Sequence, residues 1–436
     1  METMKVLRDF CKDSCACGKT HEFCMDDVII EKGAINRVSE VVERYHAKKV
    51  FLLADVNTYE AAGEKIHENL TAHKIAVTPY VFKNGNIEPD EHYVGAAVMG
   101  FDPTCDLILG VGSGVINDIG KILANVAGKP YVIFGTAPSM DGYASATSSM
   151  AVAGLKVSLP SKQANVIMTD TEVLAKAPDV LLQAGIGDML AKYVAICEWK
   201  IAKLVVGEYY CERVADLVLS SLDKCVSNLE GLLAREEAAV ANVFEGLVLC
   251  GIGMSLAGCS RPASGVEHYF SHIWDMRGLD KGTPVALHGI QCAIGTRLAI
   301  ERYEQLKKIT PNREQALRYA TQFDFAKWSE ELRAYVGAGA NAMIAQEAKE
   351  GKYDKDRHAK RLEIILSNWE ALLAIMNTLP SEEEIVAILD RLGAPKSVEE
   401  IGLRGEDIPI TFAATKDIRD KYVLSRLYWD LGILTY

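Results

Sequence analysis

The chain has 436 residues, of which 49 % are hydrophobic and 24 % are charged, and its formal net charge is −12. This composition is typical of a globular protein long enough for two or three domains, and the negative charge argues against binding to nucleic acids or anionic membrane surfaces. The start of the chain lacks the apolar core of a secretion signal, and no run of about 18 apolar residues indicates a transmembrane helix. We therefore expect a cytoplasmic protein without a membrane span.

The first 25 residues are rich in potential metal ligands: Cys11, Cys15, Cys17, His21 and Cys24. Their spacing resembles a zinc knuckle but lacks a framework of paired CxxC motifs. We favour a mobile, thiol-rich segment over residues 1–25, and a second, structural metal site is the alternative. Most of the other cysteines are expected to be small buried residues in a reducing compartment.

Residues 26–170 alternate between strand and helix patterns. Apolar runs predict strands at 28–31, 49–53, 75–82, 106–109, 131–134 and 165–169. The intervening segments predict helices at 33–46, 57–72, 91–101 and 115–126. Residues 145–160 have strand character with a Gly turn and predict a hairpin beside the sheet. Repeated strand–helix units with apolar strands predict an α/β domain with a mostly parallel sheet.

Residues 171–436 carry long helical patterns instead. They predict helices at 178–203, 209–233, 238–256, 265–273, 289–305, 313–319, 349–378, 381–392 and 418–431. We therefore expect an all-helical second domain, with a ligand in the cleft between the two domains.

A glycine-rich turn, GVGSGVINDIGK, runs from Gly110 to Lys121, directly after a predicted strand. Glycines at such a turn let the backbone approach a phosphate, and the helix that follows supplies N–H donors. The third glycine is out of position for a GxGxxG fingerprint, so a plain tight turn is the alternative. Asp55 ends an earlier strand, where its carboxylate can accept from a ribose hydroxyl and would repel a 2′-phosphate, which favours NAD over NADP.

A second polar loop, TAPSMDGYAS, runs from Thr136 to Ser145 after the next strand. The carboxyl ends of strands in open α/β sheets are where ligands bind, so this loop and the glycine-rich turn are expected to form one site. A loop without ligand contacts is the alternative.

The histidines of the second domain indicate a metal site. His268 and His272 share one face of a predicted helix, and His288 follows a Gly- and Pro-containing turn. An HxxxH pair by itself is more often structural, and the preceding Glu267 is out of register for HExxH. Asp188, at the start of another predicted helix, is either a dipole-stabilised N-terminal charge or a third ligand. Two histidines and an aspartate suit zinc, with iron and nickel as alternatives.

Together these motifs resemble the sn-glycerol-1-phosphate dehydrogenase family, within the superfamily of iron-containing alcohol dehydrogenases, glycerol dehydrogenase and dehydroquinate synthase. The motifs that carry the resemblance are GVGSGVINDIGK, TAPSMDGYAS, GIGDMLAK, SRPASGVEHYFSH and LHG. They follow in order from about residue 26 to His288, and the likeness is looser towards the C-terminus. The resemblance implies a nucleotide-binding α/β domain followed by a helical domain.

The resemblance also implies roles for individual residues. Asp188, His268 and His288 become the metal ligands. Asp141, Asp188 and His272 contact the substrate. The residues implied for NAD are Asp55, Gly112, Gly114, Val115, Ile116, Asn117, Asp118, Thr136, Ala137, Pro138, Ser139 and Ser145. Lys192 stands where the four-ligand alcohol dehydrogenases of the superfamily have a further histidine, which fits the three-ligand branch.

The expected activity is the NAD(P)-dependent interconversion of dihydroxyacetone phosphate and sn-glycerol 1-phosphate, in a homodimer that serves phospholipid biosynthesis. His272 is expected to bind substrate or relay a proton, and Asp141 to orient substrate hydroxyls. Lys192 and Arg261 are the candidate phosphate partners. The alternatives are glycerol dehydrogenase or another polyol dehydrogenase, a dehydroquinate synthase-like cyclase, and a non-catalytic NAD- or metal-binding regulator.

Overall fold

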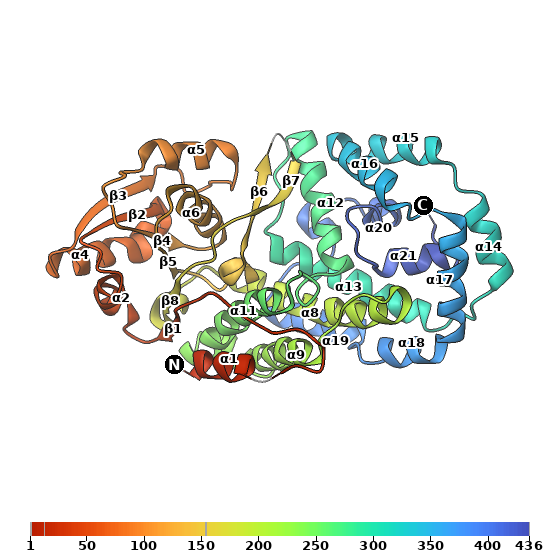
Figure 1. The fold of residues 1–436 in the computed structure, drawn as a ribbon, viewed down its shortest axis with the longest axis horizontal. Helices are drawn as coiled ribbons and strands as arrows, with labels where there is room; N and C mark the ends of the chain where they lie inside the picture. Colours follow the sequence, from red (N-terminus) through yellow and green to blue (C-terminus); the bar gives the residue numbers. More distant parts are fainter. Residues whose placement is uncertain (1, 13, 153–154, 436) are drawn as a thin grey trace. The chain divides into compact units, whose positions relative to one another are not determined.

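The computed structural model describes residues 2–12, 14–152 and 155–435 (Figure 1). They form two compact units, Met1–Met189 with Asp216–Cys259, and Leu190–Ala215 with Ser260–Tyr436. We expected a single boundary at residue 170. The helical segments up to Met189 and from Asp216 to Cys259 group with the sheet instead.

The first unit is built on a six-stranded parallel sheet with the strand order β1-β8-β5-β4-β2-β3. Its strands are β1 (Asp27–Glu31), β2 (Lys49–Asp55), β3 (Ala76–Phe82), β4 (Leu107–Gly112), β5 (Tyr131–Gly135) and β8 (Val166–Asp170). The predicted parallel sheet is thereby confirmed. β6 (Thr147–Val152) and β7 (Leu155–Pro160) form the predicted antiparallel hairpin, whose expected Gly turn lies at residues 153–154, outside the described residues.

The central strands are apolar along their whole length because helices cover the sheet (Figure 1). All six residues of β4 are buried, and its neighbours Leu52 and Val132 belong to the same core. The helices of the first unit are α1 (Glu2–Lys12), α2 (Val38–Glu43), α3 (Val56–Thr58), α4 (Glu64–Ala72), α5 (Glu91–Gly100), α6 (Gly114–Ala127), α7 (Thr171–Leu174), α10 (Leu229–Leu233) and α11 (Glu237–Ala257).

The N-terminal segment is ordered on the first unit, in contrast to the mobile segment that we predicted. α1 buries Met4, Leu7 and Phe10, and Thr3 Oγ1 donates to Glu245 Oε1 at 2.5 Å. The apolar residues recur every three or four positions, so the helix presents one apolar stripe to the core.

Two helices pass from one unit to the other, and the rest of the second unit is helical. α8 (Asp179–Val206) enters the second unit at Leu190, and α9 (Glu212–Val226) enters the first at Asp216. The other helices of the second unit are α12 (Val266–Lys281), α13 (His288–Leu306), α14 (Arg313–Thr321), α15 (Phe325–Val336), α16 (Ala340–Glu350), α17 (Lys355–Ser367), α18 (Trp369–Met376), α19 (Glu382–Leu392), α20 (Ile408–Thr415) and α21 (Leu424–Asp430). Thus α12 continues well beyond its predicted end at 273, and the predicted helix 349–378 is divided into α17 and α18.

Two helices, α8 and α11, are long and apolar enough to pass a length-and-composition test for membrane spans, against our expectation of none. However, 78 % of the apolar window in α8 and 72 % of that in α11 is buried inside the structure. Burial of this kind is typical of core helices in a globular protein, which explains their composition.

Candidate active site

Asp55 and the glycine-rich turn, both expected at the nucleotide site, lie at the carboxyl ends of two neighbouring strands of the sheet. β2 ends at Asp55 and β4 ends at Gly112, and these strands are neighbours with Leu53 opposite Gly110. The strand order reverses here, since the chain continues from β2 to β3 on one side and from β4 to β5 on the other. The crevice at such a switch point is the usual ligand site of open α/β sheets.

Asp55 is a buried helix cap. Its Oδ1 accepts the backbone N–H groups of Asn57 at 2.8 Å and Thr58 at 2.9 Å. Burial raises the pKa of the carboxyl, and these N–H groups oppose the rise. Because both bonds use Oδ1, a ribose hydroxyl can donate to Oδ2.

The glycine-rich turn places a helix N-terminus at the same edge. A Cβ on Gly112 would lie 2.6 Å from Ile116, so the turn requires glycine there. Ser113 caps α6 without a side-chain hydrogen bond, and N–H groups at such a helix start are suited to binding a phosphate. Ile116 and Asn117 point into the protein, and Asn117 Nδ2 donates to Gly142 O at 3.1 Å. Any contact of these two residues with NAD is therefore expected through the backbone.

Lys121 holds the two loops together, a role that the sequence analysis did not assign. Its ammonium is buried and donates to Thr147 O at 2.6 Å, Ser145 Oγ at 3.1 Å and Gly142 O at 3.2 Å. It also pairs with Asp118 Oδ1 at 3.0 Å. A lysine and an aspartate three residues apart on the helix after the glycine turn were the available sequence signal.

The TAPSMDGYAS loop is also fixed to α8. Asp188 lies nine residues after the first residue of this helix, so our expectation of a charge at a helix start is wrong. A Cβ on Gly185 would lie 1.9 Å from Pro138 O, so the backbone of the loop contacts the backbone of α8 directly. The Asp141 N–H donates to Asp188 Oδ2 at 2.9 Å. The predicted substrate residue and the predicted metal ligand are thus hydrogen-bonded within the first unit.

In the second unit, two predicted ligands lie together at helix starts. His268 is in the first turn of α12 and His288 is the first residue of α13, and their ring centroids are 5.1 Å apart. The Cys292 thiol, one turn into α13, lies 3.6 Å from His288 Nε2. Donor atoms of these three residues lie within 4.8 Å of one another. Imidazole and thiol groups at this spacing suit a divalent transition metal.

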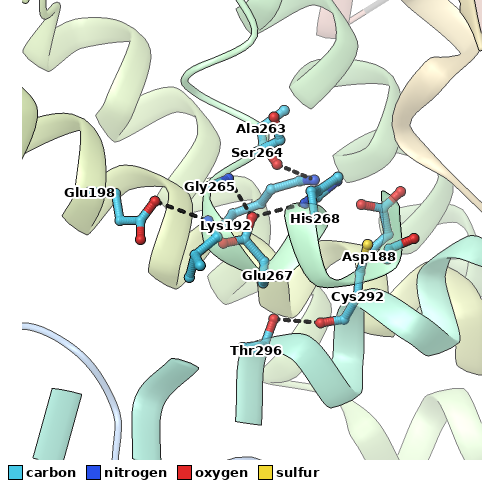
Figure 2. A network of polar contacts seen from close by, with 12 residues as sticks. Asp188, Lys192, Glu198, Ala263, Ser264, Gly265, Glu267, His268, Cys292 and Thr296 are labelled. Atoms are coloured by element: carbon cyan, nitrogen blue, oxygen red, sulfur yellow. Dashed lines mark hydrogen bonds and ion pairs between the residues drawn. The ribbon is translucent and has the colours of Figure 1, made fainter. Parts of the chain in front are cut away.

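The neighbouring polar groups orient both imidazoles. Figure 2 shows the network around His268, whose Nδ1 donates to Glu267 Oε1 at 2.8 Å. The lone pair of His268 is therefore on Nε2, the arrangement that metal-binding histidines adopt. Ser271 Oγ lies 2.9 Å from His288 Nδ1, so a hydrogen bond holds the second ring in place as well.

Glu267 is one of two buried carboxyl groups beside this cluster. Glu267 accepts the N–H group of Gly265 at 2.5 Å (Figure 2). Glu198 accepts the N–H groups of Val266 at 3.0 Å and Leu424 at 2.7 Å. Burial and, second, the nearby Glu267 charge raise the pKa of Glu198 to about 8. Through these hydrogen bonds, Glu198 fixes the backbone before α12.

The remaining candidates are His272, Lys192 and Arg261, all in the second unit. His272 lies one turn beyond His268 and stacks over His288 with centroids 6.2 Å apart, as expected for a residue beside the ligands. Lys192 is buried and donates to Ala263 O at 3.0 Å, one helical turn after Asp188 on the continuous α8. The Arg261 guanidinium donates to both carboxylate oxygens of Glu208 and to Tyr422 O, which indicates a structural role, and its part in phosphate binding stays a prediction.

Comparison with known proteins adds a family context. A family model described as iron-containing alcohol dehydrogenase matches residues 29–178. The glycerol-1-phosphate dehydrogenase (NAD(P)+) of Halalkalibacterium halodurans is 32 % identical over 301 residues, which cover 68 % of this chain and 75 % of that protein. The protein of the same name from Thermococcus sibiricus is 34 % identical over 272 residues, covering 62 % and 75 %. The crystal structure of glycerol dehydrogenase from Schizosaccharomyces pombe aligns with a TM-score of 0.61 at 17 % identity, covering 95 % of this chain and 90 % of that one, which shows a shared fold.

Proposed function

Because this chain belongs to the glycerol-1-phosphate dehydrogenase family of the iron-containing alcohol dehydrogenases, we propose that it interconverts dihydroxyacetone phosphate and sn-glycerol 1-phosphate with NAD(H). The observation that carries the proposal is the pair His268 and His288, held with oriented imidazoles at the starts of two helices. A regulator that had lost catalysis has no need for this arrangement. The two buried supporting groups, Glu267 and Ser271, favour a working metal centre.

We assign Asp188, His268 and His288 as ligands of one divalent metal. Two imidazoles and a carboxylate leave a coordination position for substrate, as in catalytic zinc sites. Zinc is favoured, with nickel and iron as the alternatives. Asp188 lies where α8 enters the second unit, one turn before Lys192, and its hydrogen bond from Asp141 orients the carboxylate.

We assign the dinucleotide to the sheet edge of the first unit. Asp55 would accept from the adenosine ribose, and the α6 N-terminus would hold the pyrophosphate. The loop from Thr136 to Ser139, with Ser145, would position the nicotinamide end. The Asp55 carboxylate favours NAD, although the relatives' name includes both dinucleotides. When bound, nicotinamide supplies or accepts the hydride, and the metal polarises the substrate carbonyl.

The protein's own side chains then perform three tasks. Asp141, at the loop bonded to Asp188, would accept hydrogen bonds from the substrate hydroxyls. His272 would exchange the proton of the substrate oxygen, because it lies one turn beyond His268 and beside His288. Lys192 would attract the substrate phosphate through its buried ammonium, and we favour it over Arg261, whose guanidinium is paired with Glu208. We further propose a cytoplasmic homodimer whose glycerol phosphate product enters phospholipid biosynthesis.

The test is steady-state oxidation of NADH with dihydroxyacetone phosphate, compared with dihydroxyacetone. We expect efficient turnover of the phosphate only, and an sn-glycerol 1-phosphate product in a chiral assay. Equal efficiency with both substrates would support the glycerol dehydrogenase alternative instead. His268→Ala should abolish turnover and the metal bound at this site while the far-ultraviolet circular dichroism spectrum stays unchanged. A variant that kept that metal would refute the ligand assignment.

A further inference from the structure

We propose that Cys15, Cys17 and His21 bind a structural zinc ion on the first unit, separate from the candidate active site. This is the alternative that the spacing alone did not favour. The donor atoms of these three residues lie within 4.8 Å of one another. Two thiolates and an imidazole are a typical part of a structural zinc site.

The backbone brings the three side chains together in a tight turn. The Gly18 N–H donates to Cys15 O at 3.0 Å, and Gly18 has a φ of +81°, in the left-handed region that glycine favours. This bond closes a four-residue turn from Cys15 to Gly18. The side chains on either side of the turn can therefore meet at one point.

The orientation of His21 matches that of a metal ligand. The residue is buried with 2 % exposure, and its Nδ1 donates to Leu256 O at 2.7 Å. A carbonyl only accepts, so the proton is on Nδ1 and the lone pair is on Nε2. Nε2 lies 3.4 Å from Cys17 Sγ. Tetrahedral zinc with ordinary bond lengths separates a sulfur and a nitrogen ligand by about 3.5 Å.

The position of the turn gives the ion a structural purpose. His21 and Lys19 donate to the carbonyls of Leu256 and Ala257, the last residues of α11. These carbonyls lack partners within the helix, so the turn acts as its C-terminal cap. Earlier in α11, a Cβ on Gly251 would lie 2.7 Å from Asp141 O. A metal here would therefore fix the N-terminal segment to the helix that supports the Asp141 loop.

The competing explanation is a hydrogen bond from the Cys17 thiol to His21 without any metal. The experiment compares metal content, by inductively coupled plasma mass spectrometry, of the full chain and its variants purified under reducing conditions. All variants carry His268→Ala, which removes a candidate ligand of the active-site metal. Zinc that remains bound can then be assigned to the Cys15, Cys17 and His21 site, and the two site assignments can fail independently.

We expect His268→Ala to retain one zinc ion per chain and His268→Ala with Cys17→Ser to retain none. Cys24→Ser is the matched control, since Cys24 is exposed and outside the cluster, and it should leave the metal content unchanged. Equal metal content with and without Cys17 would overturn the proposal.

A second measurement covers the case in which Cys17→Ser does not fold. Cobalt exchanged into the His268→Ala protein should show thiolate-to-cobalt charge-transfer absorption and the intense visible bands of tetrahedral cobalt. A spectrum without charge-transfer absorption would also overturn the proposal. Chelation of the ion should lower the melting temperature by several degrees, because a cap and a cross-link are lost together.

Discussion

His268 Nδ1 donates a hydrogen bond of 2.8 Å to the side chain of its own neighbour, Glu267. The same carboxylate oxygen accepts the Gly265 N–H, so one buried group fixes both the imidazole and the start of α12. The position of the lone pair on Nε2 thus follows from the fold and is present before any ion binds.

The first prediction concerns Glu267→Gln. The amide oxygen can still accept from His268, but the neutral acceptor gives the imidazole less basic character. Loss of such an outer partner weakens metal affinity by about 10–100-fold. Competition with a chromophoric chelator measures the affinity. Since Glu267 is close to Glu198, the substitution should also lower the pKa of Glu198. Unchanged metal affinity would contradict the proposed role of Glu267.

The second prediction concerns the pH dependence of stability. Burial raises the pKa of Glu198 to about 8 in the folded protein, against the ordinary glutamate value of 4.5 in the unfolded chain, so the folded protein binds the proton more tightly. Its contribution is fully present below about pH 4.5 and is lost as pH rises through 8. Urea unfolding of the chelator-treated protein should therefore show a falling free energy of unfolding over this window, relative to Glu198→Gln. Parallel pH profiles for the two proteins would refute the assignment.

The third prediction concerns dinucleotide choice. Asp55→Asn keeps an oxygen that can cap α3 but removes the negative charge that would face a 2′-phosphate. We expect kcat/KM with NADPH to rise relative to NADH by about tenfold, or ~1.4 kcal/mol. Asp55→Ala is the control for the cap and should lower stability by about 1 kcal/mol. If the ratio of kcat/KM with NADPH to kcat/KM with NADH were unchanged in Asp55→Asn, Asp55 would not contact the adenosine ribose.

The fourth prediction distinguishes between Lys192 and Arg261, the two candidate phosphate-binding residues. Lys192→Met should raise KM for dihydroxyacetone phosphate by roughly 30-fold, about 2 kcal/mol, because it removes a charge-assisted hydrogen bond. Activity with dihydroxyacetone should change much less. Arg261→Met instead breaks the pair with Glu208 and should lower the melting temperature without changing the preference between the two substrates. The reverse pattern would return the phosphate role to Arg261.

The sequence by itself determined the α/β architecture up to Asp170 and the motifs of the site. Strand and helix periods are local properties, and the short apolar runs of β4 and β5 are typical of strands in a parallel sheet that is covered on both faces. The motif GVGSGVINDIGK likewise indicated a turn followed by a helix, and the structure has both. The assigned ligands and substrate residues remain predictions.

Only the tertiary structure decided which buried polar groups meet. Lys121 and Arg261 are both buried cations, but one ties two loops together and the other pairs with Glu208. Such partners are far apart in the chain, and a buried charge must be satisfied by whichever carboxylate or carbonyl the packing brings to it. For the same reason, spacing alone could not show that His21 docks on the end of α11, where its Nε2 faces Cys17.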